Sequence, residues 1–153
     1  MKFVALFIVL AAGMIAADPD GFGLWTGAEL KAAGKKLAPK MDQNKVASES
    51  LVNYGNHLLM VAHREANGQA ELHETQADIF VVESGEGTLV VGGTVVEPKT
   101  VSPHEVRGSS IKGGVRKPLH TGDVVHIAAK TPHQLLLPAG KQITYFVVKV
   151  DTP

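Results

Sequence analysis

A chain of 153 residues is long enough for one domain with a real core, but not for two. Its 15 lysine and arginine residues balance its 15 aspartate and glutamate residues, so we expect no nucleic-acid partner and no attraction to anionic lipid. The chain has no cysteine, which excludes disulfides, thiolate metal sites and cysteine nucleophiles.

The first segment, residues 1–17, has the pattern of a secretory signal peptide. Lys2 precedes an apolar run over residues 3–15, and small residues follow before the acidic Asp18. The run is shorter than the roughly 20 apolar residues that span a bilayer. Cleavage after Ala17 would release a periplasmic or secreted protein that has no membrane contact. An uncleaved membrane anchor is the alternative.

Residues 18–44 are predicted to form an N-terminal extension with one short helix. Thr26 and Glu29 have the spacing of a capping box, and Pro39 marks the end of the helix. Gly34 within it costs about 1 kcal/mol relative to alanine. An apolar stripe would pack against the main domain, and it consists of Leu30, Ala33 and Leu37.

Residues 45–150 are predicted to form the main domain, in which apolar residues mostly recur with the period of β-strands. A turn signal, SGEG at Ser84, separates two predicted strands, and a Gly- and Ser-rich segment at residues 106–117 is predicted to be a loop. Many short strands between turns predict an all-β sandwich or barrel. The predicted strands are residues 47–54, 57–65, 70–74, 78–84, 87–93, 94–98, 123–128, 133–138 and 142–150.

Polar residues at the ends of these strands suggest a metal site. Glu71 and His73 are two residues apart, so they share one face of a strand, while Asp78 and His133 each begin another strand. Two imidazoles and one carboxylate can hold a divalent first-row ion with open coordination positions. We therefore expect His73, Asp78 and His133 as ligands, with Glu71 as a fourth. The alternative is a hydrogen-bonded cluster without metal.

Further residues are candidates for roles around this site. His126 lies on a core strand near His133, so His126 and Glu71 are the candidates for proton transfer. His63 is a candidate for lining the barrel. The segment 107–114 is interpreted as a mobile loop, with a lid over an anionic ligand as the alternative. Six residues are expected to shape a pocket: Phe80, Val82, Leu135, Leu137, Tyr145 and Val147.

Two segments, residues 71–93 and 122–137, resemble the signature motifs of the cupin superfamily, which are small β-barrels of the jelly-roll type. In the first motif, Asp78 and Gly85 keep the family's interval between its acid and its glycine, and GEGTLVVGG resembles the family's hairpin. In the second motif, Gly122 and His133 keep the family's interval. The resemblance implies a jelly-roll (double-stranded β-helix) barrel with a metal site.

The ligand positions depart from the family pattern. Glu71 stands in place of a histidine, and Asp78 stands in place of a glutamate. Both replacements keep oxygen donors, so the resemblance implies a divalent transition metal, either Fe, Mn, Zn or Ni, without choosing among them.

Three functions remain open on this basis. The resemblance favours an exported cupin with a divalent-metal site that acts on or binds a small oxygenated organic molecule. The alternatives are a non-catalytic module that binds a ligand or a metal, and a structural barrel. Cupins are commonly dimers, so we expect a homodimer.

Overall fold

The computed structural model describes residues 18–152, so the predicted signal peptide lies outside the described part of the chain. No helix within residues 18–152 is long and apolar enough to cross a membrane. The helical elements are α1 (Gly27–Leu37) and a 3-10 turn (Ala38–Lys40). The strands are β1 (Val46–Asn53), β2 (His57–Arg64), β3 (Ala70–His73), β4 (Gln76–Val91), β5 (Thr94–Val96), β6 (Lys99–Ser102), β7 (Glu105–Gly108), β8 (Ser110–Lys112), β9 (Val115–His120), β10 (Val124–Ile127), β11 (His133–Leu136) and β12 (Ile143–Asp151).

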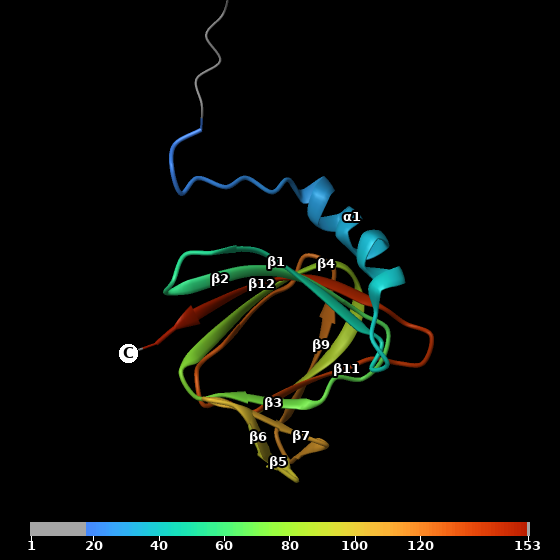
Figure 1. The fold of residues 1–153 in the computed structure, drawn as a ribbon. Helices are drawn as coiled ribbons and strands as arrows, with labels where there is room; N and C mark the ends of the chain where they lie inside the picture. Colours follow the sequence, from blue (N-terminus) through green and yellow to red (C-terminus); the bar gives the residue numbers. More distant parts are fainter. Residues whose placement is uncertain (1–17, 153) are drawn as a thin grey trace, which may run out of the picture.

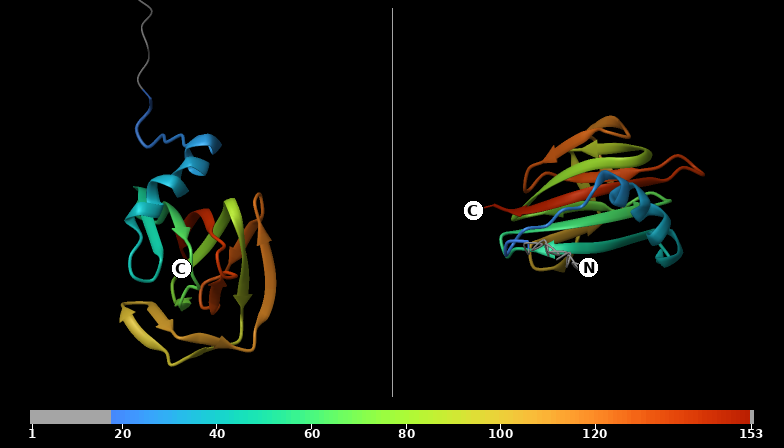
Figure 2. Two further views of the ribbon diagram at one scale, coloured as in Figure 1. Left: turned by 90° about the vertical axis from the view of Figure 1, so that its right-hand side faces the viewer. Right: turned by 90° about the horizontal axis from the view of Figure 1, so that it is seen from above.

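Most strands belong to one antiparallel sheet that curls into a barrel (Figure 1). Its order is β1-β2-β12-β4-β11-β3-β7-β6, and β9 and β10 also pair with β4. Strands β5 and β8 form a separate small sheet. In Figures 1 and 2, β1, β2 and β12 form one wall, and β3, β6 and β7 face them from the opposite side. The predicted all-β barrel with a short N-terminal helix is confirmed.

Strand β4 joins the two walls of the barrel. Its first half pairs with β12 and β10, and its second half pairs with β9 and β11. The turn predicted at Ser84 is therefore wrong, because the chain bends there without reversing. Gly85 lies at the bend with φ +85°, and a Cβ on it would come within 2.0 Å of the carbonyl oxygen of Gln142. Only glycine fits this position.

The loop predicted at residues 106–117 is also wrong. The chain there forms β7, β8 and the start of β9, each paired with another strand. Paired glycines at its turns, Gly113 and Gly114, have positive φ and obscured the strand pattern in the sequence. Strand β7 pairs with β3 and thereby brings its side chains to the barrel wall.

Helix α1 covers the outside of the wall formed by β1 and β2 (Figure 1). The predicted capping box is present: the Thr26 hydroxyl accepts from the Glu29 N–H at 3.3 Å, and the Glu29 carboxylate accepts from the Thr26 N–H at 2.8 Å. Leu37 is buried against Ala47 and Val61 in a small cluster beneath the helix.

The predicted barrel-lining role of His63 is wrong, because His63 lies in this outer layer under α1. Its Nδ1 is 2.9 Å from the Thr144 hydroxyl, and its side chain is buried. The same contact explains Gly34, since a Cβ there would lie 2.4 Å from the Thr144 hydroxyl oxygen and 3.2 Å from His63 Nδ1. The glycine permits close packing of helix and sheet at the cost of helix propensity.

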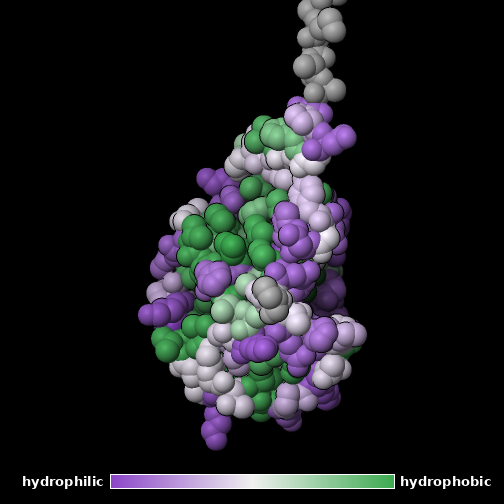
Figure 3. Space-filling model, turned by 90° about the vertical axis from the view of Figure 1, so that its left-hand side faces the viewer, coloured by the Kyte–Doolittle hydropathy of each residue, from purple (hydrophilic) through white to green (hydrophobic). Residues whose placement is uncertain are grey.

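The main core fills the barrel on the side away from α1. All six residues predicted to shape the pocket belong to it: Phe80, Val82, Leu135, Leu137, Tyr145 and Val147. On the surface, Figure 3 shows hydrophobic patches among hydrophilic side chains on the face that includes the C-terminal end. Single apolar side chains that remain exposed include Val101, Val115 and Val124.

We predict that Gly34→Ala lowers the free energy of unfolding by about 1–3 kcal/mol, because overpacking outweighs the better helix propensity of alanine. Urea denaturation measures this change. Gly27→Ala is the matched control, since a Cβ on Gly27 meets no atom within 4 Å. A stabilised Gly34→Ala protein would contradict the close packing described here.

Candidate metal centre

Strand register brings the predicted residues together inside the barrel. On β3, Glu71 lies opposite Arg107 of β7 on one side and His133 of β11 on the other. His73 lies opposite Glu105 of β7. Glu71 and His73 point to the same face, as their spacing predicts. Three neighbouring strands therefore deliver two imidazoles and two carboxylates to one place.

His73 is held with its Nε2 atom toward the centre of this group. Its Nδ1 bonds the carboxylate of Glu105. Its Nε2 lies 3.2 Å from Asp78 Oδ2 and 3.6 Å from Glu71 Oε2. A carboxylate that fixes one ring nitrogen while the other faces a ligand position is the usual support of a metal-binding histidine.

His133 is oriented in the same way by the backbone. Its Nδ1 donates to the carbonyl oxygen of Thr131 at 3.1 Å, so its Nε2 carries the lone pair. Burial lowers the pKa of His133, which keeps the ring neutral. The Nε2 atom is buried without a hydrogen-bond partner, 3.7 Å from the nearest oxygen of both Glu71 and Asp78. A buried acceptor without a donor needs a partner.

Three residues supply donor atoms that lie within 4.8 Å of one another: Glu71, His73 and His133. Two imidazole nitrogens and a carboxylate suit a divalent transition metal. The unpartnered Nε2 atom of His133 carries the lone pair that it would donate to such an ion. The residues present therefore fit a cupin-type metal site, although they do not select the metal.

Asp78 also reaches the group, but it has a counter-ion of its own. Lys149 lies directly opposite Asp78 on β12, and its Nζ donates to both carboxylate oxygens at 2.8 and 3.0 Å. The same ammonium is 2.9 Å from His73 Nε2. Asp78 and Lys149 are 2% and 18% exposed, so this ion pair is largely buried. Lys149 thus contacts the nitrogen that a metal would bind.

The carboxylates of Glu71 and Asp78 stabilise a positive charge at Nε2 of His73. Burial is the largest influence and lowers the pKa of His73, but hydrogen bonds to Asp78 and Glu105 outweigh it and raise the pKa to about 9. A proton, the Lys149 ammonium and a metal ion all compete for the same lone pair. Binding of one of them excludes the other two from this atom.

Arg107 completes the network from outside the donor group. One end of its guanidinium bonds Glu71, and the other lies 2.5 Å from Glu105. It therefore holds both acids in place through the fork geometry of arginine. Arg107 contacts Oε1 of Glu71, whereas Oε2 of Glu71 faces His73 and His133.

A cavity of about 230 Å³ opens beside the centre. Its polar lining includes Arg64, Glu71, Asp78, Arg107 and Lys149. Of the six predicted pocket residues, all in the barrel core, three line this cavity, namely Phe80, Tyr145 and Val147, and the other three do not. A small molecule in this cavity would contact the carboxylates on one side and an apolar wall on the other.

The structure does not bring His126 to this centre. Its backbone lies opposite Ile79 in the sheet, and its side chain is exposed, whereas the neighbouring Ile127 is buried. Strand alternation explains this difference, since adjacent residues face opposite sides. His126 lines a surface groove with Lys117 and Asp123.

Comparison with solved structures identifies the fold. A Klebsiella pneumoniae protein with a double-stranded β-helix domain matches with a TM-score of 0.54, covering 72% of this chain and 80% of that one at 13% identity. The cupin-type barrel predicted from the two motifs is confirmed. The chain has the cupin fold.

Two further structures share this cupin fold. The protein TT1209 from Thermus thermophilus matches with a TM-score of 0.53 at 16% identity, covering 78% of this chain and 94% of that one. DMSP lyase DddQ from Ruegeria pomeroyi matches with a TM-score of 0.50 at 15% identity, covering 69% of this chain and 47% of that one. No family model and no curated protein matches the chain.

Sequence reasoning missed three residues of this candidate site. Lys149 shares the strand face of Tyr145 and Val147, so alternation along β12 could have placed it in the barrel. Glu105 and Arg107 lie in or beside a segment interpreted as a loop. Glu105 and Arg107 alternate with Val106 and Gly108, and this alternation is too short to predict a strand.

We predict that Asp78→Asn lowers the free energy of unfolding by about 3 kcal/mol, because the Lys149 ammonium then lacks its buried counter-ion. Urea denaturation measures the loss, and the double variant Asp78→Asn, Lys149→Met should recover much of it. Glu86→Gln is the control, since it breaks an exposed pair with Lys141 that spans 2.9 Å. Equal effects of Asp78→Asn and Glu86→Gln would contradict a buried ion pair.

Proposed function

We propose that the chain is an exported cupin that binds one divalent transition metal and acts on a small oxygenated organic molecule. The metal ligands are Nε2 of His73, Nε2 of His133 and the Glu71 carboxylate. The observation that carries this proposal is the buried Nε2 of His133, which has no partner although its Nδ1 is fixed by Thr131. Together with the likeness in fold, this donor set supports a metal rather than an ordinary core histidine.

When bound, such a metal would supply a Lewis acid with open positions for an oxygenated substrate. The protein residues have separate tasks. Glu105 and Thr131 orient the two imidazoles, and the Phe80 side of the cavity excludes water. Glu71 Oε2 faces the two imidazoles as the oxygen ligand, with Arg107 holding the other carboxylate oxygen. A small-molecule substrate is also compatible with the lyase among the proteins that share the fold.

A non-catalytic module is the second candidate, and Lys149 favours it. Its ammonium already contacts His73 Nε2 and neutralises Asp78, so the cluster can exist without a metal. In this form, the barrel would bind a small ligand through the same cavity. Metal affinity separates the two candidates.

We predict that the chelator-treated protein takes up one equivalent of Mn(II), Fe(II), Ni(II) or Zn(II) in a calorimetric titration. His73→Ala and His133→Ala should each weaken binding more than about 100-fold, because ligand loss exceeds the 10- to 100-fold effect of losing a supporting residue. His104→Ala is the control, since His104 is exposed and its one ion pair within residues 18–152 is with Glu74. Equal binding by His133→Ala would remove that residue from the site.

The same titration tests the competition with Lys149. Lys149→Met should bind the metal about tenfold more tightly, because the competing ammonium and its repulsion of the ion are gone. Lys141→Met, which alters an exposed lysine, should leave the affinity unchanged. Weaker metal binding by Lys149→Met would contradict the competition.

Export and assembly remain part of the proposal. The pattern of residues 1–17 supports a signal peptide, and the homodimer rests on the resemblance to cupins. We predict that the exported protein begins at Asp18, because cleavage follows Ala17. Amino-terminal sequencing after expression with its native leader checks this prediction. A start at Met1 would show that the segment is retained.

A further inference from the structure

Arg64, the last residue of β2, is a buried cation without a counter-ion. Its side chain is 8% exposed, and it forms no ion pair with any acid among residues 18–152. Its Nε is buried and has no hydrogen-bond partner. An unpaired charge and an unpaired donor are both costly in a protein interior, so this guanidinium lacks a counter-ion and its Nε lacks an acceptor.

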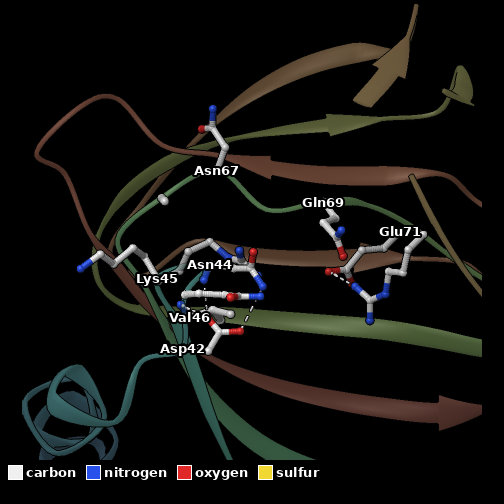
Figure 4. Close-up of a pocket in the computed structure, with 11 residues that line it drawn as sticks. Asp42, Asn44, Lys45, Val46, Asn67, Gln69 and Glu71 are labelled. Atoms are coloured by element: carbon white, nitrogen blue, oxygen red, sulfur yellow. Dashed lines mark hydrogen bonds and ion pairs between the residues drawn. The ribbon is translucent and has the colours of Figure 1, made fainter. Parts of the chain in front are cut away.

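Arg64 lies in the wall between two cavities. The inner one is the 230 Å³ cavity beside the candidate metal centre, and the outer one measures about 350 Å³. The two share Val46, Arg64, Glu71 and Arg107. Figure 4 shows the outer cavity, with Gln69 and Glu71 together at one end and Asp42 and Asn44 at the other. A ligand held by Arg64 is therefore next to Glu71 of the centre.

The two other cations that line the inner cavity are already paired with acids. Arg107 forms ion pairs with Glu71 and Glu105, and Lys149 forms one with Asp78. Asp42 faces the outer cavity, but its carboxylate accepts from Asn44 and from the backbone N–H of Val46. Among residues 18–152, two cations of these walls form no ion pair, Lys45 and Arg64, and only Arg64 is buried.

The guanidinium is also held in position. Gly68 packs against it so closely that a Cβ there would lie 3.2 Å from Arg64 Cζ and Nη1. Tyr145 lines the same inner cavity, and burial raises the pKa of its phenol, so the hydroxyl stays protonated and able to donate. A fixed guanidinium fork beside a hydroxyl suits an acceptor with two coplanar oxygens.

We propose that Arg64 binds the carboxylate of a small monocarboxylic acid, whose body lies in the inner cavity between the apolar wall and Glu71. The neighbouring carboxylates of Glu71 and Asp78 disfavour a second negative charge, which selects a monoanion over a phosphate dianion. The proposal rests on the proposed function, because it names the substrate class of that same cavity. It assigns to Arg64 the role of substrate anchor, outside the metal ligands.

The test uses the chelator-treated protein, so that no metal can hold the acid. Acetate, butyrate and benzoate are titrated beside their uncharged amides and beside inorganic phosphate. Nuclear magnetic resonance follows the Nε–H signal of Arg64, assigned through its own side chain, and calorimetry measures affinity. Arg64→Lys keeps the charge without the fork, and Arg116→Lys makes the same change at an exposed arginine.

The expected result is a downfield shift of the Arg64 Nε–H signal with at least one acid and with none of the amides. Arg64→Lys should weaken that binding at least tenfold, and Arg116→Lys should not change it. No shift with any acid, equal binding of acid and amide, or tighter binding of phosphate would each overturn the proposal. If Arg64→Lys does not fold, the signal of the unaltered protein still decides.

A second arm separates this inference from the proposed function. His133→Ala should bind the acid as the unaltered protein does, because Arg64 acts without the metal. Arg64→Lys should in turn keep its metal affinity. Loss of acid binding in His133→Ala would overturn the anchor role of Arg64. Acid binding without metal uptake would uphold Arg64 while contradicting the metal proposal.

Discussion

Three carboxylates around one buried histidine are the constraint on which this site depends. Glu71, Asp78 and Glu105 surround His73, and the lysine and arginine side chains that pair with them within residues 18–152 are Lys149 and Arg107. Acids in a partly buried group need cations nearby. The raised pKa of His73 and the Lys149 contact are two responses to this demand, and a metal ion would be a third.

The barrel supplies the rigidity that such a cluster requires. Strand β4 passes from one wall to the other through the bend at Gly85, so the two walls form one hydrogen-bonded structure. Asp78 and Lys149 come from one wall, while Glu71 and His73 come from the other. Because ladder register sets each cross-strand neighbour, a shift by one residue would turn the whole donor set away from the cavity. Fold and site are therefore one arrangement.

The sequence predicts the parts of this account that follow from local pattern. Strand alternation and two spaced motifs were enough to predict the barrel and to group His73 with His133. The continuous path of β4 and the strands at residues 105–120 depend on pairing between distant segments, which a local pattern does not contain. Lys149 and Arg64 were missed for a similar reason, since only the register shows which acid each one faces or lacks.

The contacts of Lys149 with His73 and Asp78 distinguish the site of this chain from the fold that it shares with other proteins. A shared fold alone leaves the reaction open, because function resides in the site. A crystal structure with anomalous scattering data, collected after soaking with Mn(II) or Zn(II), tests the central claim most directly. We predict one anomalous peak about 2.0–2.2 Å from Nε2 of both His73 and His133, with the Lys149 ammonium moved off His73. No peak between the two imidazoles, with Lys149 still against His73, would contradict the metal site.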